Sequence, residues 1–350
     1  MRIYFLCIGF LFLSQQVRTQ NKGRIPLINK LELNQVTKGT IAKYWLEFMN
    51  NGMGQTISIP IVIAKGKEEG PVLGLVAAIH GNELNGIPVI QQVFKELDLE
   101  QLKGTIIGVP GVNVVSIDRD RRRFVDEEDL NRNFPGKEFG NRSQQYVWKI
   151  ANQILPHFDY LVDMHTASFG RVNSLYVRAD LDNDTIAQMA TWQDCDIILN
   201  SKGMPSAGSG LAMLRTFRAE AMLRGIPTIT VEYGNPQVYQ SDIIAKGVNG
   251  IKRLTNGLMM TNFKEITEVV PPFKCRKSYW IYMQEGGLLT VQVNLKDRVK
   301  KGELIAKVYN PFGDLVRAYF APEDGIVIGK STNPVNMDGG RIIHLGILEE

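Results

Sequence analysis

The distribution of hydrophobic positions divides the chain into two parts. In the first part, from about residue 57 to 263, apolar runs of strand length alternate with helix-like segments. Strands are expected at 57–64, 72–79, 104–110, 160–164 and 228–231, and helices at 86–97, 143–155 and 210–224. Strands that are apolar on both faces and separated by helices predict a mainly parallel sheet, covered by helices on both faces.

The second part follows Pro271-Pro272 and is predicted to be a β-domain without helices. Short apolar runs follow one another at close spacing, with Gly and Asp turns between them. The segments 286–306 and 324–343 resemble each other, and this weak repeat is similar to the barrel-sandwich hybrid of biotinyl and lipoyl domains. Those domains carry a modified Lys at a hairpin between their halves, whereas the corresponding stretch 309–314 contains no Lys. We therefore expect a structural domain that carries no biotin or lipoate.

A short apolar run at residues 3–13 predicts an export signal. It follows a positive start at Met1-Arg2 and precedes the polar residues 14–20. A membrane-spanning helix needs about 20 apolar residues, so the run is too short to span a bilayer and fits the core of a secretory signal peptide. A buried N-terminal strand and a lipoprotein anchor at Cys7 are less favoured alternatives. The other apolar runs are strand-sized, so we expect an exported chain without a stable membrane span.

Composition narrows the class of protein. Of 350 residues, 44% are hydrophobic and 22% are charged, the ordinary mix of a globular chain. The small net charge of +4 argues against a nucleic-acid binder, which usually has a dominant basic face. Three cysteines are too few for a disulfide scaffold. After export, Cys195 and Cys275 would either pair or stay free.

The candidate chemistry centres on two histidines that end apolar strands. His80 follows the strand at 72–79, and Glu83 stands three residues further on, at the start of the next helix. His165 ends the strand that begins at Tyr160. The carboxyl ends of parallel strands face the crevice where such sheets bind ligands. Two His and one carboxylate form the open ligand set of hydrolytic zinc sites, which leaves one position for water.

A structural role is the alternative for each histidine. A single His is more often a hydrogen-bonded structural residue, but two of the four histidines of the chain lie at the ends of core strands. His157 and His344 have no such setting, and we expect them to be structural.

A long loop without periodicity, residues 111–142, carries the second group of candidates. Arg121 and Arg122 are interpreted as part of a solvated charge cluster. Arg132 beside Asn131 differs, because a planar guanidinium and an amide together suit recognition of a carboxylate.

Glu232 is the third candidate, because it stands at the end of the apolar strand that begins at Thr228. A buried acid is costly without a partner, so we expect it in the same crevice. The alternative is a solvated acid at a strand end.

These residues together resemble the succinylglutamate desuccinylase/aspartoacylase family, which belongs to the wider zinc carboxypeptidase group. The resemblance lies in His80-Gly81-Asn82-Glu83, Asp129-Leu130-Asn131-Arg132, His165 and Val231-Glu232-Tyr233-Gly234, in this order. It covers about residues 57–234, and a C-terminal β-domain is also typical of the family. The implied fold is an α/β, zinc-carboxypeptidase-like mixed sheet with helices on both faces, plus a C-terminal all-β, barrel-sandwich-like domain. The implied organisation is a signal peptide over 1–20, a catalytic domain over 21–268 and the β-domain over 269–350.

The resemblance also implies a role for each site residue. One zinc ion would be held by His80, Glu83 and His165, with Asp129 as a partner of a zinc-binding His. Arg123 would polarise the scissile carbonyl group, although Arg122 stays open for that role because the spacing to Asn131 varies in the family. Asn131 and Arg132 would bind a substrate carboxylate, and Glu232 would be the general base.

The predicted reaction is therefore hydrolysis of the amide bond of a small N-acyl amino acid by metal-activated water. One alternative is an exported metallocarboxypeptidase that acts on short peptides or cell-wall fragments. The other is a binding protein that has kept the fold without catalysis, which the complete ligand set and Glu232 disfavour. The acyl group, the amino acid and the oligomeric state stay open at this point.

Overall fold

The computed structural model describes residues 25–203, 215–264 and 267–349. The predicted signal peptide and Cys7 lie outside these residues. Within the described ranges, no helix is long and apolar enough to cross a membrane. Cys195 and Cys275 are both buried and do not form a disulfide in the structure.

The chain forms strands and short helices in alternation up to about residue 257, and only strands in the described residues after it. The strands are β1 (Leu27–Ile28), β2 (Thr40–Asn50), β3 (Thr56–Lys65), β4 (Glu68–Ala77), β5 (Lys103–Pro110), β6 (Tyr160–His165), β7 (Arg171–Asn173), β8 (Leu175–Ala179), β9 (Ile197–Asn200), β10 (Thr228–Tyr233), β11 (Phe273–Tyr282), β12 (Gly287–Val291), β13 (Arg298–Val299), β14 (Leu304–Tyr309), β15 (Leu315–Phe320), β16 (Gly325–Ser331), β17 (Val335–Asn336) and β18 (Arg341–Leu348). The helices are α1 (Gly86–Glu96), α2 (Val114–Ile117), α3 (Arg142–Lys149), α4 (Asp184–Thr191), α5 (Phe217–Leu223) and α6 (Ser241–Gly257), with a π-helical turn η3 (Ile150–Ile154) and the 3₁₀ turns η1 (Leu33–Gln35), η2 (Leu130–Arg132) and η4 (Leu155–His157).

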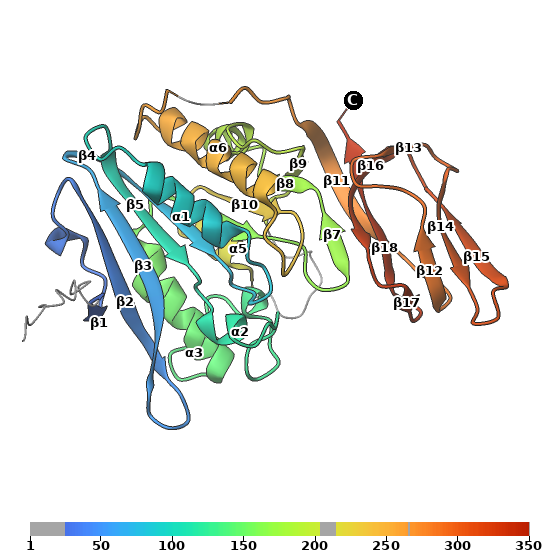
Figure 1. The fold of residues 1–350 in the computed structure, drawn as a ribbon, viewed down its shortest axis with the longest axis horizontal. Helices are drawn as coiled ribbons and strands as arrows, with labels where there is room; N and C mark the ends of the chain where they lie inside the picture. Colours follow the sequence, from blue (N-terminus) through green and yellow to red (C-terminus); the bar gives the residue numbers. More distant parts are fainter. Residues whose placement is uncertain (1–24, 204–214, 265–266, 350) are drawn as a thin grey trace, which may run out of the picture.

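One large mixed sheet organises the molecule (Figure 1). Its strand order is β1-β2-β3-β5-β4-β6-β10-β8-β9-β11-β18-β16-β13, and β7 pairs with β16 beside this path. The central strands β5, β4, β6 and β10 are mutually parallel, so their carboxyl ends meet at one edge. β3 and β8 run antiparallel to this block. This arrangement confirms the predicted mixed α/β fold.

Helices cover both faces of the central strands, as predicted. On one face α1, α4 and α6 pack their apolar sides onto the sheet, with residues such as Val89, Met189 and Ile251 in one core cluster. On the other face α3, η3 and α5 pack onto it, with Tyr146, Ile150 and Phe217 in a second cluster. The two core clusters pack against opposite faces of the central strands, so the edge that carries the carboxyl ends of these strands is rigid.

The C-terminal strands continue the large sheet. β11 pairs in parallel with β9 and antiparallel with β18, and β16 pairs with both β18 and β7. A separate four-stranded sheet, β15-β14-β12-β17, lies at the far end of the molecule (Figure 1). Apolar residues between the two sheets form a further core cluster. A β-rich C-terminal region is thus confirmed, whereas the domain boundary at residue 269 stays a prediction.

Three details differ from the expectations. The long strand β2 and the pair β8 and β9 were not predicted. The helix expected at 143–155 changes from α3 into η3 at Ile150. In the segment 210–224, the described helix α5 begins only at Phe217.

Candidate functional site

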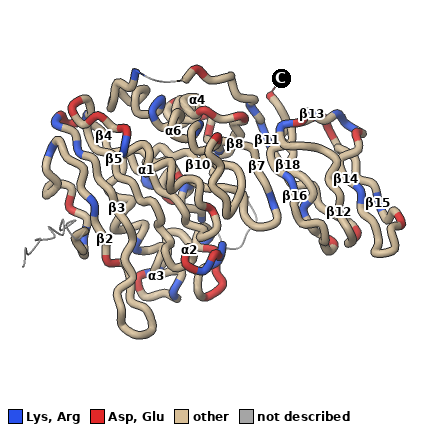
Figure 2. The backbone as a smooth tube through the Cα atoms, in the orientation of Figure 1, with Lys and Arg blue, Asp and Glu red and all other residues tan. Residues whose placement is uncertain are grey.

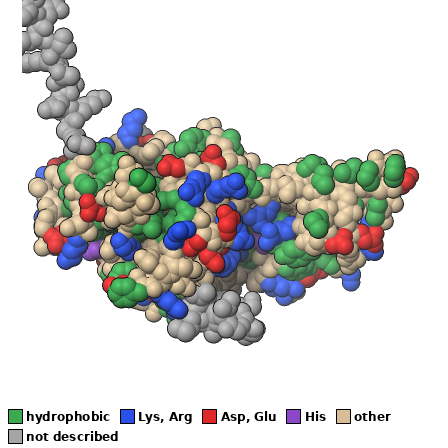
Figure 3. Space-filling model, turned by 90° about the horizontal axis from the view of Figure 1, so that it is seen from below, with side chains coloured by type: hydrophobic (Ala, Val, Ile, Leu, Met, Phe, Trp, Pro, Cys, Tyr) green, Lys and Arg blue, Asp and Glu red, His purple; other side chains and the backbone are tan. Residues whose placement is uncertain are grey.

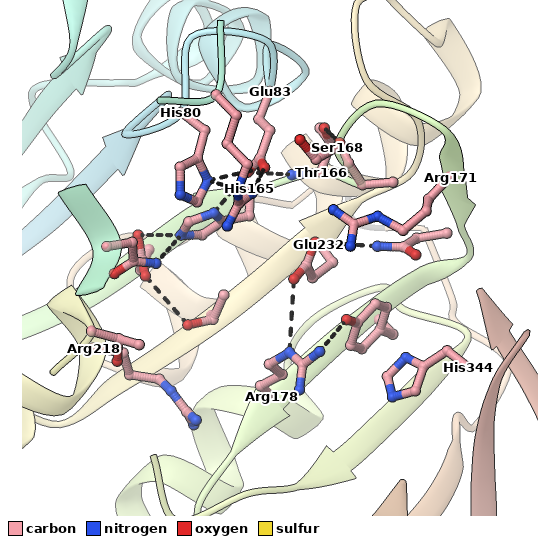
Figure 4. A pocket seen from close by; sticks show the side chains of 18 of the residues that line it. His80, Glu83, His165, Thr166, Ser168, Arg171, Arg178, Arg218, Glu232 and His344 are labelled. Atoms are coloured by element: carbon pink, nitrogen blue, oxygen red, sulfur yellow. Dashed lines mark hydrogen bonds and ion pairs between the residues drawn. The ribbon is translucent and has the colours of Figure 1, made fainter. Parts of the chain in front are cut away.

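The three strand-end candidates meet at one edge of the sheet. β4 and β10 both lie beside β6 and run parallel to it. His80 follows β4, His165 ends β6 and Glu232 lies on β10. All three line a cavity of about 620 Å³ (Figure 4). The site therefore lies where open α/β sheets usually bind ligands.

A tight turn positions His80 and Glu83 on the same side of the cavity. At Gly81 any Cβ atom would lie 2.0 Å from the backbone of Ser116, so only glycine fits there. The Gly81 amide donates a hydrogen bond to the backbone oxygen of Arg121, 2.9 Å away. Glu83 lies in this turn, whereas the helix α1 begins at Gly86, so the expected position of Glu83 in the helix is corrected.

The side chains of His80, Glu83 and His165 converge (Figure 4). One carboxylate oxygen of Glu83 lies 2.9 Å from Nδ1 of His80, and the other lies 2.8 Å from Nδ1 of His165. One ligand atom from each residue lies within 4.8 Å of the other two. All three side chains are almost fully buried. Two imidazoles and one carboxylate at this spacing could hold a metal ion.

The outer nitrogen of each histidine is held by a second carboxylate. Nε2 of His80 lies 2.9 Å from Asp129, and Nε2 of His165 lies 3.0 Å from Asp163. If each Nε2 carries the proton that it donates to its carboxylate, each Nδ1 presents a lone pair to the space between His80, Glu83 and His165. Carboxylates in this position orient metal-binding histidines and make them better ligands.

The electrostatics of this cluster reflect competition between protons and cations. Burial raises the pKa of Glu83, but the neighbouring His80 and His165 outweigh it and hold that pKa well below its usual range. Burial lowers the pKa of His165, but Asp163 and Glu83 together raise it well above its usual value. Without a metal ion, the pocket thus attracts a proton to His165, which a bound cation would displace.

In the loop after α2, the structure places Arg122 in the cavity and Arg123 outside it. Nη1 of Arg122 donates to Glu83 at 2.8 Å, and Nη2 donates to Asp129 at 2.9 Å. Arg123 is exposed and donates to the backbone oxygen of Glu127. Acidic and basic positions lie side by side in this loop (Figure 2). The geometry therefore places Arg122, the alternative that the resemblance left open for polarising the carbonyl group, at the site instead of Arg123, and it corrects the interpretation of Arg122 as a solvated residue.

Asn131 and Arg132 also line the cavity, on the turn η2. The Asn131 side-chain oxygen accepts a hydrogen bond of 2.7 Å from the backbone amide of Phe217, which fixes the amide group. Nη1 of Arg132 donates to the backbone oxygen of Asn131 at 2.7 Å. Asp129 accepts from the Asn131 amide at the start of the turn. The loop is thereby folded so that an amide and a guanidinium face the same space.

Glu232 lies in the cavity with its side chain only 14% exposed. Nε of Arg178 lies 3.7 Å from one carboxylate oxygen, and Nδ2 of Asn173 donates to the other at 3.3 Å. Burial raises the pKa of Glu232, and Arg178 opposes this rise only in part. A carboxylate with a raised pKa inside a cleft suits proton transfer near neutral pH.

Several cavity residues were not predicted. Asp163 stands two residues before His165 on β6, and the alternation of a strand could have identified it as a neighbour on the same face. Further polar or aromatic cavity residues come from separate parts of the chain and gave no local signal, among them Arg171, Asn173, Arg178, Arg218, Trp280 and Arg341. His344, expected to be structural, lines the cavity wall. Its ring stacks on Trp280 with 5.2 Å between the ring centres, and its Nε2 forms a hydrogen bond with the Ser278 hydroxyl. His157 lies outside the site, on η4.

Comparison with known proteins places this site in a family. The model of the succinylglutamate desuccinylase/aspartoacylase catalytic domain matches residues 69–258. The chain belongs to this family. Its members are deacylases that act on amide bonds. The resemblance found in the sequence motifs is thus confirmed.

Individual relatives and solved structures match over most of the chain. A curated relative, the N-alpha-acetyl-L-2,4-diaminobutyric acid deacetylase of Halomonas elongata, is 27% identical over 282 residues, which are 76% of this chain and 77% of that protein. The product-bound structure of the ectoine utilization protein EutE (DoeB) from Ruegeria pomeroyi matches with a TM-score of 0.77 at 20% identity, over 88% of this chain and 95% of that one.

A second solved structure gives the same result for the fold. The succinylglutamate desuccinylase/aspartoacylase from Rhodobacter sphaeroides matches with a TM-score of 0.76 at 20% identity. The match covers 89% of this chain and 96% of that chain. It therefore includes the C-terminal strands as well as the part matched by the family model.

Proposed function

We propose that this chain is a zinc-dependent amidohydrolase that cleaves N-acyl amino acids into a carboxylate and a free amino acid. The observation that carries the proposal is the position of Glu232. Its poorly exposed carboxylate lies in the same cavity as the set His80, Glu83 and His165. A metal-ligand set with an adjacent acid of raised pKa is the combination that metal-assisted hydrolysis needs.

The donor atoms fit zinc. Two imidazole nitrogens and a carboxylate oxygen are the ligands of catalytic zinc sites, and Nδ1 of both histidines faces Glu83. Asp129 and Asp163 orient His80 and His165, respectively, through contacts with their Nε2 atoms. When bound, zinc would lower the pKa of a water molecule and polarise a carbonyl group.

The residues of the chain would then perform the remaining steps. Glu232 would accept the proton of the attacking water and deliver it to the leaving amine. Arg122 would donate hydrogen bonds to the oxygen on which negative charge develops. It is held for this role by Glu83 and Asp129, and these neighbours, working against burial, raise its pKa. It therefore stays charged throughout.

Asn131 and Arg132 would bind the α-carboxylate of the amino acid. Their amide and guanidinium face the cavity from one rigid turn, and this pair suits a planar carboxylate. The name of the Halomonas relative describes an N-acetylated amino acid as its substrate, which supports this class for the present chain.

The structure favours small substrates over long peptides. Trp280, Arg341 and His344, which come from the C-terminal strands, line the cavity together with the metal-ligand set. Strands beyond the matched catalytic segment thus form part of the cavity wall and limit the room for a long chain.

A substrate screen tests the proposal. Zinc-loaded protein would be incubated with N-acetyl, N-succinyl and N-formyl amino acids, with dipeptides and with longer peptides, and free amine would be measured. We expect turnover of N-acyl amino acids and much slower cleavage of peptides. Faster cleavage of peptides would favour the metallocarboxypeptidase alternative, and stoichiometric zinc without turnover of any amide would favour a binding protein.

We further propose that the chain is exported. The support is the apolar run at residues 3–13 between a positive start and a polar stretch. Expression of the full chain in a bacterium, followed by mass analysis of the N-terminal peptide, should find a mature end near residue 21 in the exported fraction. An intact N-terminus in the cytoplasmic fraction would contradict this.

A further inference from the structure

Two neighbouring helices begin at a pair of side chains that bind each other. Asn85 immediately precedes α1 and Gln240 immediately precedes α6, and these two helices lie side by side (Figure 1). The backbone amide of Gln240 donates a hydrogen bond of 3.2 Å to Oδ1 of Asn85, and Nδ2 of Asn85 donates one of 3.3 Å to Oε1 of Gln240. Nδ2 of Asn85 also donates to the backbone oxygen of Tyr233 at 2.9 Å. We call this set of contacts the Asn85 clasp.

The Asn85 side chain is not used by its own helix. An Asn in this position usually caps the first turn of the helix that follows it. Asn85 makes no such bond to α1, because both ends of its amide face the segment after β10. The residue is fully buried, so loss of these partners would leave polar groups unpaired inside the protein. The clasp is thus a connection between two distant segments of the chain.

The segment after β10 is folded to fit this connection. Gly234 has a φ of +70°, which favours glycine, and a Cβ atom there would lie 2.5 Å from Oε1 of Gln240 and displace that side chain. Gln237 also has a left-handed backbone, with a φ of +54°, and its amide donates to the backbone oxygen of Asn82 at 3.0 Å. The turn that follows β4 is therefore held from this segment at two points, Asn82 and Asn85.

The clasp joins the two halves of the proposed active site. On one side, Asn85 stands two residues after Glu83, in the turn that also carries His80. On the other side, Tyr233 directly follows Glu232 on β10. Pairing with β6 fixes β10, whereas the turn lies beyond the end of β4 and is not part of the sheet. A connection from this turn to β10 therefore sets where His80 and Glu83 lie relative to Glu232.

A substrate in the cavity would not touch the clasp. Charged side chains gather at the surface where the helical part of the molecule meets the C-terminal strands (Figure 3). Asn85 lies beneath the surface, and none of Asn85, Tyr233 and Gln240 lines the cavity. Any effect of the clasp on turnover must therefore pass through the residues whose positions it fixes.

We propose that Asn85 is a positioning residue, which together with Gln240 holds the turn of the metal ligands in place relative to Glu232. This rests on the proposed function, in which Glu232 accepts the proton of the attacking water. A general base must lie within hydrogen-bond reach of that proton, and a misplacement of about 1 Å can cost about 100-fold in rate. Loss of the clasp should therefore lower kcat and leave KM nearly unchanged, because Asn131 and Arg132, the proposed substrate-binding pair, lie on a separate loop.

Substitutions at equal zinc content measure this effect. Asn85→Ala should lower kcat by about 10- to 100-fold. Asn85→Asp keeps the acceptor for the Gln240 amide but loses the donor to Tyr233, so it should also lower kcat. Gln240→Glu keeps the acceptor oxygen and should retain a kcat close to that of the wild type, whereas Gln240→Ala should not. Wild-type kcat in Asn85→Ala would overturn the proposal. If that variant does not fold, Gln240→Ala decides in the same way, because the Gln240 side chain is partly exposed.

Asn249→Ala is the matched control. Asn249 is also buried, and its side chain also joins a backbone oxygen and a backbone amide of another segment, both of Thr267, at 3.2 and 3.0 Å. It lies on α6 and does not line the cavity. The control variant should lose thermal stability as Asn85→Ala does, but it should keep its kcat. An equal loss of kcat in both variants would assign the effect to stability alone and refute a positioning role.

A double-mutant cycle with Glu232 separates positioning from a general loss of structure. If Asn85 acts through Glu232, the loss caused by Asn85→Ala should largely disappear in a Glu232→Gln background, where no base remains to be positioned. If Asn85 only supports the fold, the two losses should multiply. Multiplication of the losses would refute the proposal.

Hydrogen exchange makes the test independent of turnover. In Asn85→Ala, the peptides that cover residues 80–86 and 233–240 should both exchange faster, whereas Asn249→Ala should leave both unchanged. Unchanged exchange of both peptides in Asn85→Ala would refute the clasp. If the wild type hydrolyses no N-acyl amino acid but both peptides respond to Asn85→Ala, the proposed function fails and the clasp stands. If amides are hydrolysed and Asn85→Ala keeps its kcat, the function stands and the positioning role fails.

Discussion

Glu232 and His165 lie directly opposite each other on the neighbouring parallel strands β10 and β6. Residues paired in this way point to the same face of a sheet, at the spacing of adjacent strands. The candidate base is therefore fixed beside a candidate metal ligand by backbone pairing, without help from a flexible loop. Reaction geometry that depends on two core strands is expected to tolerate changes in the loops better than changes in the register of these strands.

The first prediction concerns metal content. His165→Ala should lose the zinc ion, because it removes one of three ligands and leaves Glu83 with a single imidazole neighbour. The measurement is the zinc-to-protein ratio after dialysis, expected to be one for the wild type. His157→Ala is the control, because His157 lies on η4 outside the cavity. Full occupancy in the His165 variant would remove this residue from the ligand set.

The second prediction concerns the carboxylate behind that histidine. Asp163→Asn keeps the shape of the side chain but weakens its hold on Nε2 of His165. Zinc affinity should fall by about 10- to 100-fold, the usual effect of losing such a partner. Competition with a chelator measures it, with the exposed Asp182→Asn as a control. Equal affinities of the two variants would show that Asp163 does not support the metal.

The third prediction separates two adjacent arginines. Arg122→Gln should lower kcat/KM by about 10²–10³-fold, because it removes a donor to the developing negative charge. Arg123→Gln should have little effect, since that side chain is exposed and contacts only the loop backbone. Zinc content must be measured in both variants, because Arg122 also contacts Glu83. A larger loss in the Arg123 variant would reverse the assignment.

These two arginines show where sequence reasoning reaches its limit. The loop at 111–142 has no periodicity, so spacing alone cannot say which guanidinium faces the cavity. The structure decides it through tertiary contacts: the amide of Gly81 bonds the carbonyl of Arg121, and Asp129 engages both His80 and Arg122. The contact between His80 and Asp129 joins residues that lie 49 positions apart in the chain.

The metal-ligand candidates were predictable for the opposite reason. His80 and His165 each end an apolar strand, and the ends of neighbouring parallel strands must meet at one edge. Local patterning also gave most of the central strands and helices. It did not identify Arg171 and Arg341 as cavity residues, because their strands β7 and β18 are brought together only by pairing with β16. Pairing between distant strands leaves no local signal in the sequence.

The fourth prediction concerns pH dependence. Glu232 must be ionised to accept a proton, so kcat/KM should fall as the pH drops through its raised pKa. Burial raises this pKa and the positive charge of Arg178 lowers it. Removing that charge in Arg178→Gln favours the protonated acid, so the acid limb should move to higher pH. Arg298→Gln should leave the limb in place, because Arg298 stacks on Phe273 and does not line the cavity. A shift of the Arg178 variant to lower pH would contradict this role of Glu232.

The most direct test of the whole account compares turnover of an N-acyl amino acid by wild-type protein and Glu232→Gln at equal zinc content. The account predicts that the variant keeps its zinc, because Glu232 is not a ligand, and that kcat falls by about 10²–10⁴-fold through loss of proton transfer. Glu83→Gln should instead lose zinc, which separates the two acids. Wild-type turnover in the zinc-loaded Glu232 variant, or loss of zinc from it together with retention by Glu83→Gln, would contradict the account.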